Sequence, residues 1–388
     1  MMESFMFYNP VRLLFGAGQT AAIDQYIPRD ARVLITYGGG SILRNGIFDE
    51  VTAALGERYI TSFGGIEANP RYETLVKALD VIREHEIDFL LAVGGGSVID
   101  GTKFIVAANA YPGEDKWEMV VKAPRPLQLG NVLPYGVVLT LSATGSEMNS
   151  GAVISREETH EKFSFNSERV FPQFSVIDPR HQLSLPKRQI ANGVVDTFVH
   201  VVEQYLTYPV DARIQDRFSE GIMQTLVEVG PKVLESPEDM GLRSNLAMAA
   251  TMGLNGLIAT GVPEDWATHR IGHELTALFG IDHAVSLAIV LPSLLRDQLE
   301  AKQAKLAQCG ARVFGIAEPD GQLAARKTID AIESFFRVMI GKIRLSDYGV
   351  VLGDAAVVWE RFADRDWHLG ERGAIDAAAV ERIFTAAL

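Results

Sequence analysis

The sequence has very little cysteine: Cys309 is the only one among 388 residues. A single cysteine cannot form an intrachain disulfide, which is typical of proteins from a reducing compartment. Its isolation also excludes thiolate-rich zinc sites and iron–sulfur clusters, because these need several cysteine ligands.

Basic clusters and long apolar runs are missing as well. The chain has 36 basic and 49 acidic residues, a net charge of −13 and no run of Lys or Arg, which argues against nucleic acid as a partner. No apolar run approaches the roughly 18 residues of a membrane-spanning helix. The N-terminus carries Glu3 and Pro10 where a signal peptide has a basic start and an apolar core. We therefore expect a soluble, cytoplasmic protein without a membrane partner.

The first half of the chain alternates strand and helix patterns. Strand-like runs occupy Arg32–Tyr37, Phe89–Val93 and Tyr135–Leu141, and helical stretches such as Tyr72–Glu84 lie between them. This alternation predicts a parallel sheet with helices on its faces.

The pattern of the second half predicts a series of helices. Apolar residues recur at helical spacing over four stretches: Gln189–Leu206, Asp211–Val229, Leu242–Ala259 and Trp266–Phe279. A chain of this length is expected to form two domains. We predict an α/β domain over residues 1–184 and an all-α domain over 185–388.

Turns of small residues follow the three predicted strands, at 38–41 (GGGS), 94–97 (GGGS) and 142–146 (SATGS). Ligands of open parallel sheets bind beyond the carboxyl ends of the strands, and glycine lets backbone N–H groups approach a phosphate. The G-x-G-x-x-G fingerprint is absent, so the turns alone predict only a phosphorylated ligand, and simple strand capping is the alternative. Ser97 and Asp100 have capping-box spacing, which predicts a helix that starts at Ser97.

Acidic and histidine side chains are paired at helical spacing in the second half. Asp196 and His200 are four residues apart, as are His269 and His273, and His283 follows ten residues later. Residues four apart share one helix face. Because the surrounding residues are apolar, we expect these groups to be buried, where charges need partners or a metal. A carboxylate with two or three imidazoles suits a divalent transition metal, and a surface ion pair is the alternative.

These segments together resemble the iron-containing (group III) alcohol dehydrogenases, and most of all their NADPH-dependent aldehyde reductase and butanol dehydrogenase branch. The resemblance runs nearly end to end. It is carried by TYGGGSI (36–42), FGGIEANP (63–70), LLAVGGGSVIDGTKFI (90–105), SATGSEMNSGAVIS (142–155), ANGVVDTFVHVVEQY (191–205), GVPEDWATHRIGHELTALFGIDHAVSLAIVLP (261–292) and LSDYG (345–349).

The resemblance implies a Rossmann-like dinucleotide-binding domain followed by a helical metal-binding domain, as in the dehydroquinate synthase-like fold, with the active site between them and a homodimer as the assembly. It implies four metal ligands: Asp196, His200, His269 and His283. It implies that His273 faces the nicotinamide and the substrate as a catalytic residue. It also implies a set of residues that line the dinucleotide: Gly38, Gly39, Gly40, Ser41, Gly94, Gly95, Gly96, Ser97, Asp100, Thr140, Ser142, Thr144 and Lys162.

The stretch after the first of these strands bears on the choice of cofactor. Members of this family that prefer NAD commonly carry an acidic residue there, which repels a 2′-phosphate. Residues 37–41 read YGGGS and contain no acid. We therefore expect NADP(H) rather than NAD(H).

The resemblance implies that the metal polarises an aldehyde oxygen while the reduced nicotinamide donates hydride. Nitrogen and oxygen ligands do not distinguish Fe²⁺ from Zn²⁺. Three aromatic residues are candidates for the substrate pocket, with core packing as the alternative for each: Phe163, Trp266 and Phe279.

Other functions remain open at this point. A non-redox enzyme, or one with a polyol or phosphate substrate, could use the same fold, although anionic substrates would need basic residues, in which the metal-binding segments are poor. A metal-dependent hydrolase would leave the glycine-rich turns without a role, and a nucleotide-binding module would leave the Asp/His cluster without one.

Overall fold

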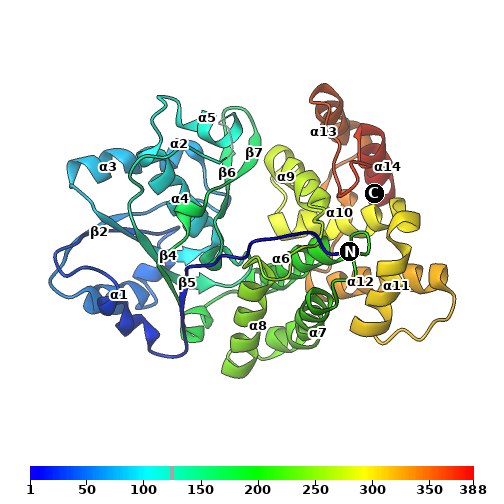
Figure 1. Cartoon of the computed structure of the whole chain (residues 1–388), viewed down its shortest axis with the longest axis horizontal. Helices are drawn as coiled ribbons and strands as arrows, with labels where there is room; N and C mark the ends of the chain where they lie inside the picture. The colour runs from blue at the N-terminus through cyan, green and yellow to red at the C-terminus, as the bar shows by residue number, and fades with distance from the viewer. Residues whose placement is uncertain (123–125) are drawn as a thin grey trace. The chain divides into compact units, whose positions relative to one another are not determined.

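The computed structural model describes residues 1–122 and 126–388. The chain forms two compact units. We call residues 8–186 with 238–247 the α/β unit, and residues 1–7, 187–237 and 248–388 the helical unit (Figure 1). Within the described ranges, no helix is both long enough and apolar enough to cross a bilayer.

A six-stranded sheet organises the α/β unit. All its neighbouring strands are parallel, in the order β1-β8-β5-β4-β2-β3. The strands are β1 (Arg12–Phe15), β2 (Arg32–Thr36), β3 (Tyr59–Phe63), β4 (Phe89–Gly95), β5 (Tyr135–Leu141) and β8 (Phe174–Ile177). The helices of this unit include α1 (Ile47–Leu55), α2 (Tyr72–Leu75), α3 (Ala78–Glu84), α4 (Gly96–Ala110) and α5 (Lys116–Val121), and an antiparallel hairpin joins β6 (Gly151–Arg156) to β7 (Glu161–Asn166).

Strand β4 shows why this sheet is covered on both sides. Leu90 and Ala92 point into one apolar core, whereas Phe89, Leu91 and Val93 point into the other. Side chains alternate between the faces of a strand, so a continuous apolar run is buried only when both faces are covered. The predicted parallel sheet with flanking helices is therefore confirmed.

The second half is helical, as predicted. Its helices are α6 (Lys187–Tyr205), α7 (Arg213–Glu235), α8 (Met240–Gly253), α9 (Ala267–Phe279), α10 (His283–Asp297), α11 (Leu299–Val313), α12 (Gly321–Met339), α13 (Leu352–Asp364) and α14 (Ala377–Ala387). Helix α6 packs against α7, α9, α10 and α12 (Figure 1), and its residues from Val194 to Tyr205 are all buried. A helix that is buried all round places its polar residues inside the protein.

Three predicted helices differ from the structure. Helix α7 continues to Glu235 rather than ending at Val229. Helix α8 ends at Gly253 rather than Ala259, because the Asn255 side chain accepts a hydrogen bond from Leu257 N (3.0 Å) and closes a turn. The predicted helix over 72–84 is interrupted at Val76 and Lys77, where Lys77 N bonds to the carbonyl three residues back.

The predicted capping box at Ser97 is also wrong. Helix α4 begins one residue earlier, with Gly95 as its N-cap and no side-chain cap. The Asp100 carboxylate instead accepts hydrogen bonds from Ser146 Oγ (2.5 Å) and Val153 N (2.9 Å), because the loop after β5 and the β6 strand offer it buried donors. Long-range partners therefore replace the local cap.

Candidate metal centre and dinucleotide cradle

Helix α6 brings Asp196 and His200 to one buried position in the helical unit. The two residues lie one turn apart and are 3% and 6% exposed. The helices α9 and α10 bring His269 and His283 to the same place, since His269 lies in the first turn of α9 and His283 is the first residue of α10. The four side chains that were predicted as ligands therefore meet within one unit.

A single oxygen atom is at the centre of this cluster. Asp196 Oδ1 lies 3.8 Å from His200 Nδ1, 3.7 Å from His269 Nε2 and 3.6 Å from His283 Nε2. These separations are too long for hydrogen bonds. They match the edges of a coordination shell, because ligands about 2.1 Å from one metal ion lie roughly 3.4 Å or more from one another in a tetrahedral arrangement.

The polar atoms of this cluster need a partner. Among the described residues, none hydrogen-bonds to Asp196 Oδ1, His200 Nδ1 or His269 Nε2, although all three atoms are buried. Leaving a buried polar atom unsatisfied is costly, and a divalent cation would satisfy all three atoms at once. The donor set, with one carboxylate and several imidazoles, fits Fe²⁺ or Zn²⁺.

The protonation states suit a metal. Burial opposes the charged form of Asp196, but the neighbouring imidazoles hold the pKa of its carboxyl well below its usual range. Burial lowers the pKa of His200 to about 4, so its imidazole is neutral at physiological pH. Metal ligands must be deprotonated, and both side chains meet this condition.

Glu203 positions His269, and the sequence analysis missed it. One of its carboxylate oxygens accepts hydrogen bonds from Thr268 N (2.6 Å) and His269 N (3.3 Å), at the start of α9. The other oxygen contacts His269 Nδ1. Ion pairing with Glu203 and Asp196 outweighs burial and raises the pKa of His269 to about 9. A carboxylate behind an imidazole fixes its ring and leaves the opposite nitrogen for a metal.

A signal for Glu203 was present in the sequence. Asp196, His200 and Glu203 occupy positions i, i+4 and i+7 of α6, which lie on one helix face.

His273, the predicted catalytic residue, is also buried, and its ring centroid lies 5.3 Å from that of His283. It is thus beside the cluster.

The three glycine-rich turns come together in the α/β unit. The turns at 38–41 and 142–146 follow β2 and β5, whereas residues 94–97 form the end of β4 and the start of α4. Because β2, β4 and β5 are neighbours in the sheet, their carboxyl ends share one edge. Close packing explains two of the glycines: a Cβ on Gly94 would lie 2.4 Å from Val98 Cγ2, and one on Gly96 would lie 2.4 Å from Thr144 Oγ1. Only glycine lets the backbone pass here.

The predicted cofactor residues differ in access to solvent. Gly39 and Ser41 are exposed, Gly94, Gly96, Ser142 and Lys162 are buried, and the rest lie between: Gly38, Gly40, Gly95, Ser97, Asp100, Thr140 and Thr144. Ser142 Oγ accepts a hydrogen bond from Gln182 Nε2 at 2.8 Å, and Thr144 Oγ1 accepts one from Ser146 N at 3.1 Å.

Asn69 connects two of these residues, and it too was missed. Its Oδ1 accepts a hydrogen bond from Lys162 Nζ (2.8 Å), and its backbone N–H donates to Ser97 Oγ (3.3 Å). Asn69 has a φ of 60°, a left-handed conformation that asparagine tolerates better than most residues. The Asn-Pro pair in the motif at 63–70 is a turn signal that could have indicated this residue.

The three candidate pocket aromatics have different surroundings. Phe163 packs against Trp117 in the core of the α/β unit (6.3 Å between ring centroids). Trp266 lies beside two of the candidate metal ligands, with its ring centroid 5.5 Å from that of His269 and 6.1 Å from that of His200. Phe279 lines a cavity of about 450 Å³ in the helical unit.

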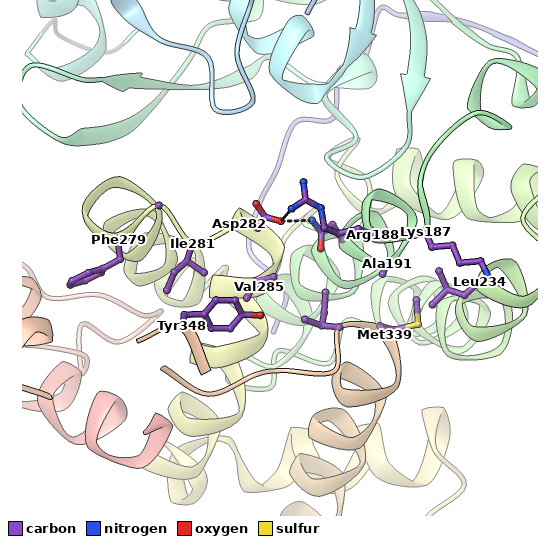
Figure 2. A pocket seen from close by; sticks show the side chains of 13 residues that line it. Lys187, Arg188, Ala191, Leu234, Phe279, Ile281, Asp282, Val285, Met339 and Tyr348 are labelled. Carbon is purple, nitrogen blue, oxygen red and sulfur yellow. Dashed lines mark hydrogen bonds and ion pairs between the residues drawn. The ribbon is translucent and has the colours of Figure 1, made fainter. Parts of the chain in front are cut away.

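This cavity borders the segment that carries His283 (Figure 2). Arg188 and Asn192, near the start of α6, each reach Asp282 Oδ2 at 3.3 Å, and Asp282 immediately precedes His283. Apolar residues such as Leu234, Val285 and Met339 line much of the remainder, together with Lys187 and Tyr348. Helix α6 therefore holds the segment before His283 as well as supplying Asp196 and His200.

Family comparisons agree with this arrangement. Residues 10–179 match the model described as iron-containing alcohol dehydrogenase. Residues 190–388 match the C-terminal model of the Fe-containing alcohol dehydrogenase family. Together the two models account for both units in chain order.

Individual relatives cover the whole chain. The NADPH-dependent aldehyde reductase YqhD of Escherichia coli is 50% identical over 388 residues, with 100% of both chains covered. A crystal structure of YqhD superposes with a TM-score of 0.97 at 49% identity, covering 100% of this chain and 99% of that one.

Two further relatives carry a different cofactor in their names. A probable NADH-dependent butanol dehydrogenase of Bacillus subtilis is 41% identical, with 90% of each chain covered. The structure of an NADH-dependent butanol dehydrogenase from Thermotoga maritima has a TM-score of 0.93 at 33% identity, covering 100% of this chain and 99% of that one. The family models, the relatives and the fold agree: the chain belongs to the iron-containing alcohol dehydrogenase family.

Proposed function

We propose that this protein reduces short- to medium-chain aldehydes to primary alcohols with NADPH and one divalent metal ion, Fe²⁺ or Zn²⁺. Each turnover takes a hydride from NADPH and one proton, and releases the alcohol and NADP⁺. The observation that carries the proposal is the position of Asp196 Oδ1, 3.6–3.8 Å from the nitrogens of three imidazoles. A homodimer in the cytoplasm is part of the same proposal.

When bound, the metal would polarise the carbonyl group and the nicotinamide would supply the hydride. Asp196 would contribute the negative charge that offsets a divalent cation, and His200, His269 and His283 would contribute nitrogen donors, with His269 releasing its proton when the metal binds. His273 lies beside this set, where its imidazole can donate a proton to the substrate oxygen that becomes the alcohol oxygen.

The glycine-rich cradle of the α/β unit supports NADPH. Residues 37–41 after β2 carry no acid that would repel a 2′-phosphate. Lys162 supplies a buried cation, which Asn69 holds in place. The closely related YqhD is described as NADPH-dependent, which points the same way, whereas butanol dehydrogenases at lower identity are described as NADH-dependent.

The cations around α9 favour a neutral substrate. Arg270 and Arg361 both pair with the buried Glu274, at 2.7 and 2.9 Å. Lys302 pairs with Asp265 at 2.8 Å and with Glu371 at 2.9 Å. Because carboxylates compensate these charges, the segment offers little attraction to an anionic substrate.

Substitution of the candidate ligands tests the metal site. We expect Asp196→Ala and His283→Ala to lose bound metal and activity, because each removes a ligand from a four-residue set. His273→Ala should retain metal and lower kcat by about 10²- to 10⁴-fold, as loss of a general acid does. Elemental analysis of the purified variants, together with kcat, measures both effects. Wild-type metal content in Asp196→Ala would refute the ligand assignment, and metal loss in His273→Ala would make His273 a ligand.

Substitution of Glu203 tests the support behind His269. We expect Glu203→Gln to weaken metal binding by about 10- to 100-fold, since the amide no longer holds His269 Nδ1 by charge. Chelator competition measures this affinity. Glu228→Gln on α7 is the matched control, because Glu228 is exposed and pairs with Lys232 at 3.0 Å on the same helix. Equal affinity in the two variants would contradict a positioning role for Glu203.

Removing and restoring the metal tests the reaction. We expect chelator-treated protein to stop oxidising NADPH in the presence of butanal, and Fe²⁺ or Zn²⁺ to restore the activity. The rate is followed by NADPH absorbance, with NADH as a parallel cofactor. If neither metal supports oxidation of either cofactor, the chain is not an aldehyde reductase, and a non-redox reaction becomes the better proposal.

A further inference from the structure

Trp266 has a backbone conformation that is unusual for its type. It is the N-cap of α9, with φ 60° and ψ 7°, in the left-handed region that glycine adopts far more readily. The residue is only partly buried, so core packing does not require a large side chain here. Strained backbone of this kind persists only where the surroundings enforce it, and it is often found at functional sites.

A buried ion cluster enforces the conformation. Lys302 Nζ on α11 donates hydrogen bonds to Leu206 O (2.7 Å), Asp265 Oδ2 (2.8 Å) and Glu371 Oε2 (2.9 Å). The side chains of Lys302, Asp265 and Glu371 are only 4–5% exposed. We call these three residues the Lys302 cluster.

The Lys302 cluster fixes the residues on both sides of Trp266. Asp265 Oδ1 accepts a hydrogen bond from Ala267 N (2.8 Å), and Asp265 N donates to Glu203 O (3.0 Å). The indole itself is oriented by a hydrogen bond from Trp266 Nε1 to Glu264 Oε2 (2.6 Å). Backbone and ring are thus held independently.

The indole ring of Trp266 contacts two imidazoles of the candidate metal centre. The indole plane makes an angle of 69° with the His269 ring and of 63° with the His200 ring, so both contacts are edge-on. These two imidazoles are candidate metal ligands, and the indole is the large apolar group beside them. A bulky rigid side chain at the edge of a reaction centre limits the size of what can approach.

We propose that Trp266 determines substrate size at the metal centre, and that the Lys302 cluster holds its backbone in position. The indole admits aldehydes with an unbranched carbon next to the carbonyl and excludes those with a branched one. This inference rests on the proposed aldehyde reductase activity and deepens it by naming the substrate class.

Activity on two aldehydes tests the proposal. In Trp266→Ala, we expect the ratio of kcat/KM for 2,2-dimethylpropanal to that for butanal to rise by about tenfold or more, because a side-chain clash is removed. Trp359→Ala on α13 is the matched control, since its ring packs against that of Phe384 on α14, with 6.3 Å between the ring centroids. If Trp266→Ala folds poorly, Trp266→Gly replaces it, because glycine accepts this φ without strain.

Substitution of Lys302 tests the role of the Lys302 cluster. Lys302→Met should shift the same ratio in the same direction while the metal content stays at one ion per chain. A merely structural role would lower the melting temperature and leave the ratio unchanged.

Ligand binding tests the shape of the site without catalysis. The visible absorption of the Co²⁺-loaded protein is titrated with imidazole and with 4-phenylimidazole. We expect the wild type to prefer imidazole, and Trp266→Gly to reduce that preference by about tenfold or more. An unchanged preference and an unchanged aldehyde ratio would each overturn the proposal. If the wild type reduces no aldehyde, the proposed function fails, and this titration alone decides the role of Trp266.

Discussion

A buried carboxylate is the constraint on which the helical unit depends. Asp196 is 3% exposed on a helix whose other buried side chains are mostly apolar. Such a charge is tolerated only if other groups compensate it. Three imidazoles converge on one of its oxygens at 3.6–3.8 Å, from α6, α9 and α10. The packing of these helices therefore serves to place four ligand atoms around one point.

Further carboxylates hold this arrangement from outside. Glu203 orients His269 and accepts hydrogen bonds from the first N–H groups of α9, and Asp265 caps the same helix one step further from the centre. Lys302 compensates Asp265 and connects it to Glu371 near the C-terminus. Each buried charge is thus paired with another, which makes the ligand geometry sensitive to residues that never touch the metal.

Much of this was predictable because it follows local periodicity. Strand runs that end in glycine, and ligands four residues apart on a helix, are short-range patterns. The predictions failed where residues far apart in the sequence form the contact. Asp100 bonds to Ser146 and Val153 rather than capping its own helix, and Asn69 reaches Lys162 across 93 positions of the chain. Local spacing also gave no indication that Lys302 pairs with Asp265, since only the tertiary fold brings them together.

X-ray absorption spectroscopy of the Zn²⁺-loaded protein measures the ligand set around the metal. We expect a first shell of only nitrogen and oxygen at about 2.1 Å, with the multiple-scattering pattern of three imidazoles. Scattering from sulfur, or from fewer than two imidazoles, would contradict it, because the metal would then be bound somewhere other than around Asp196.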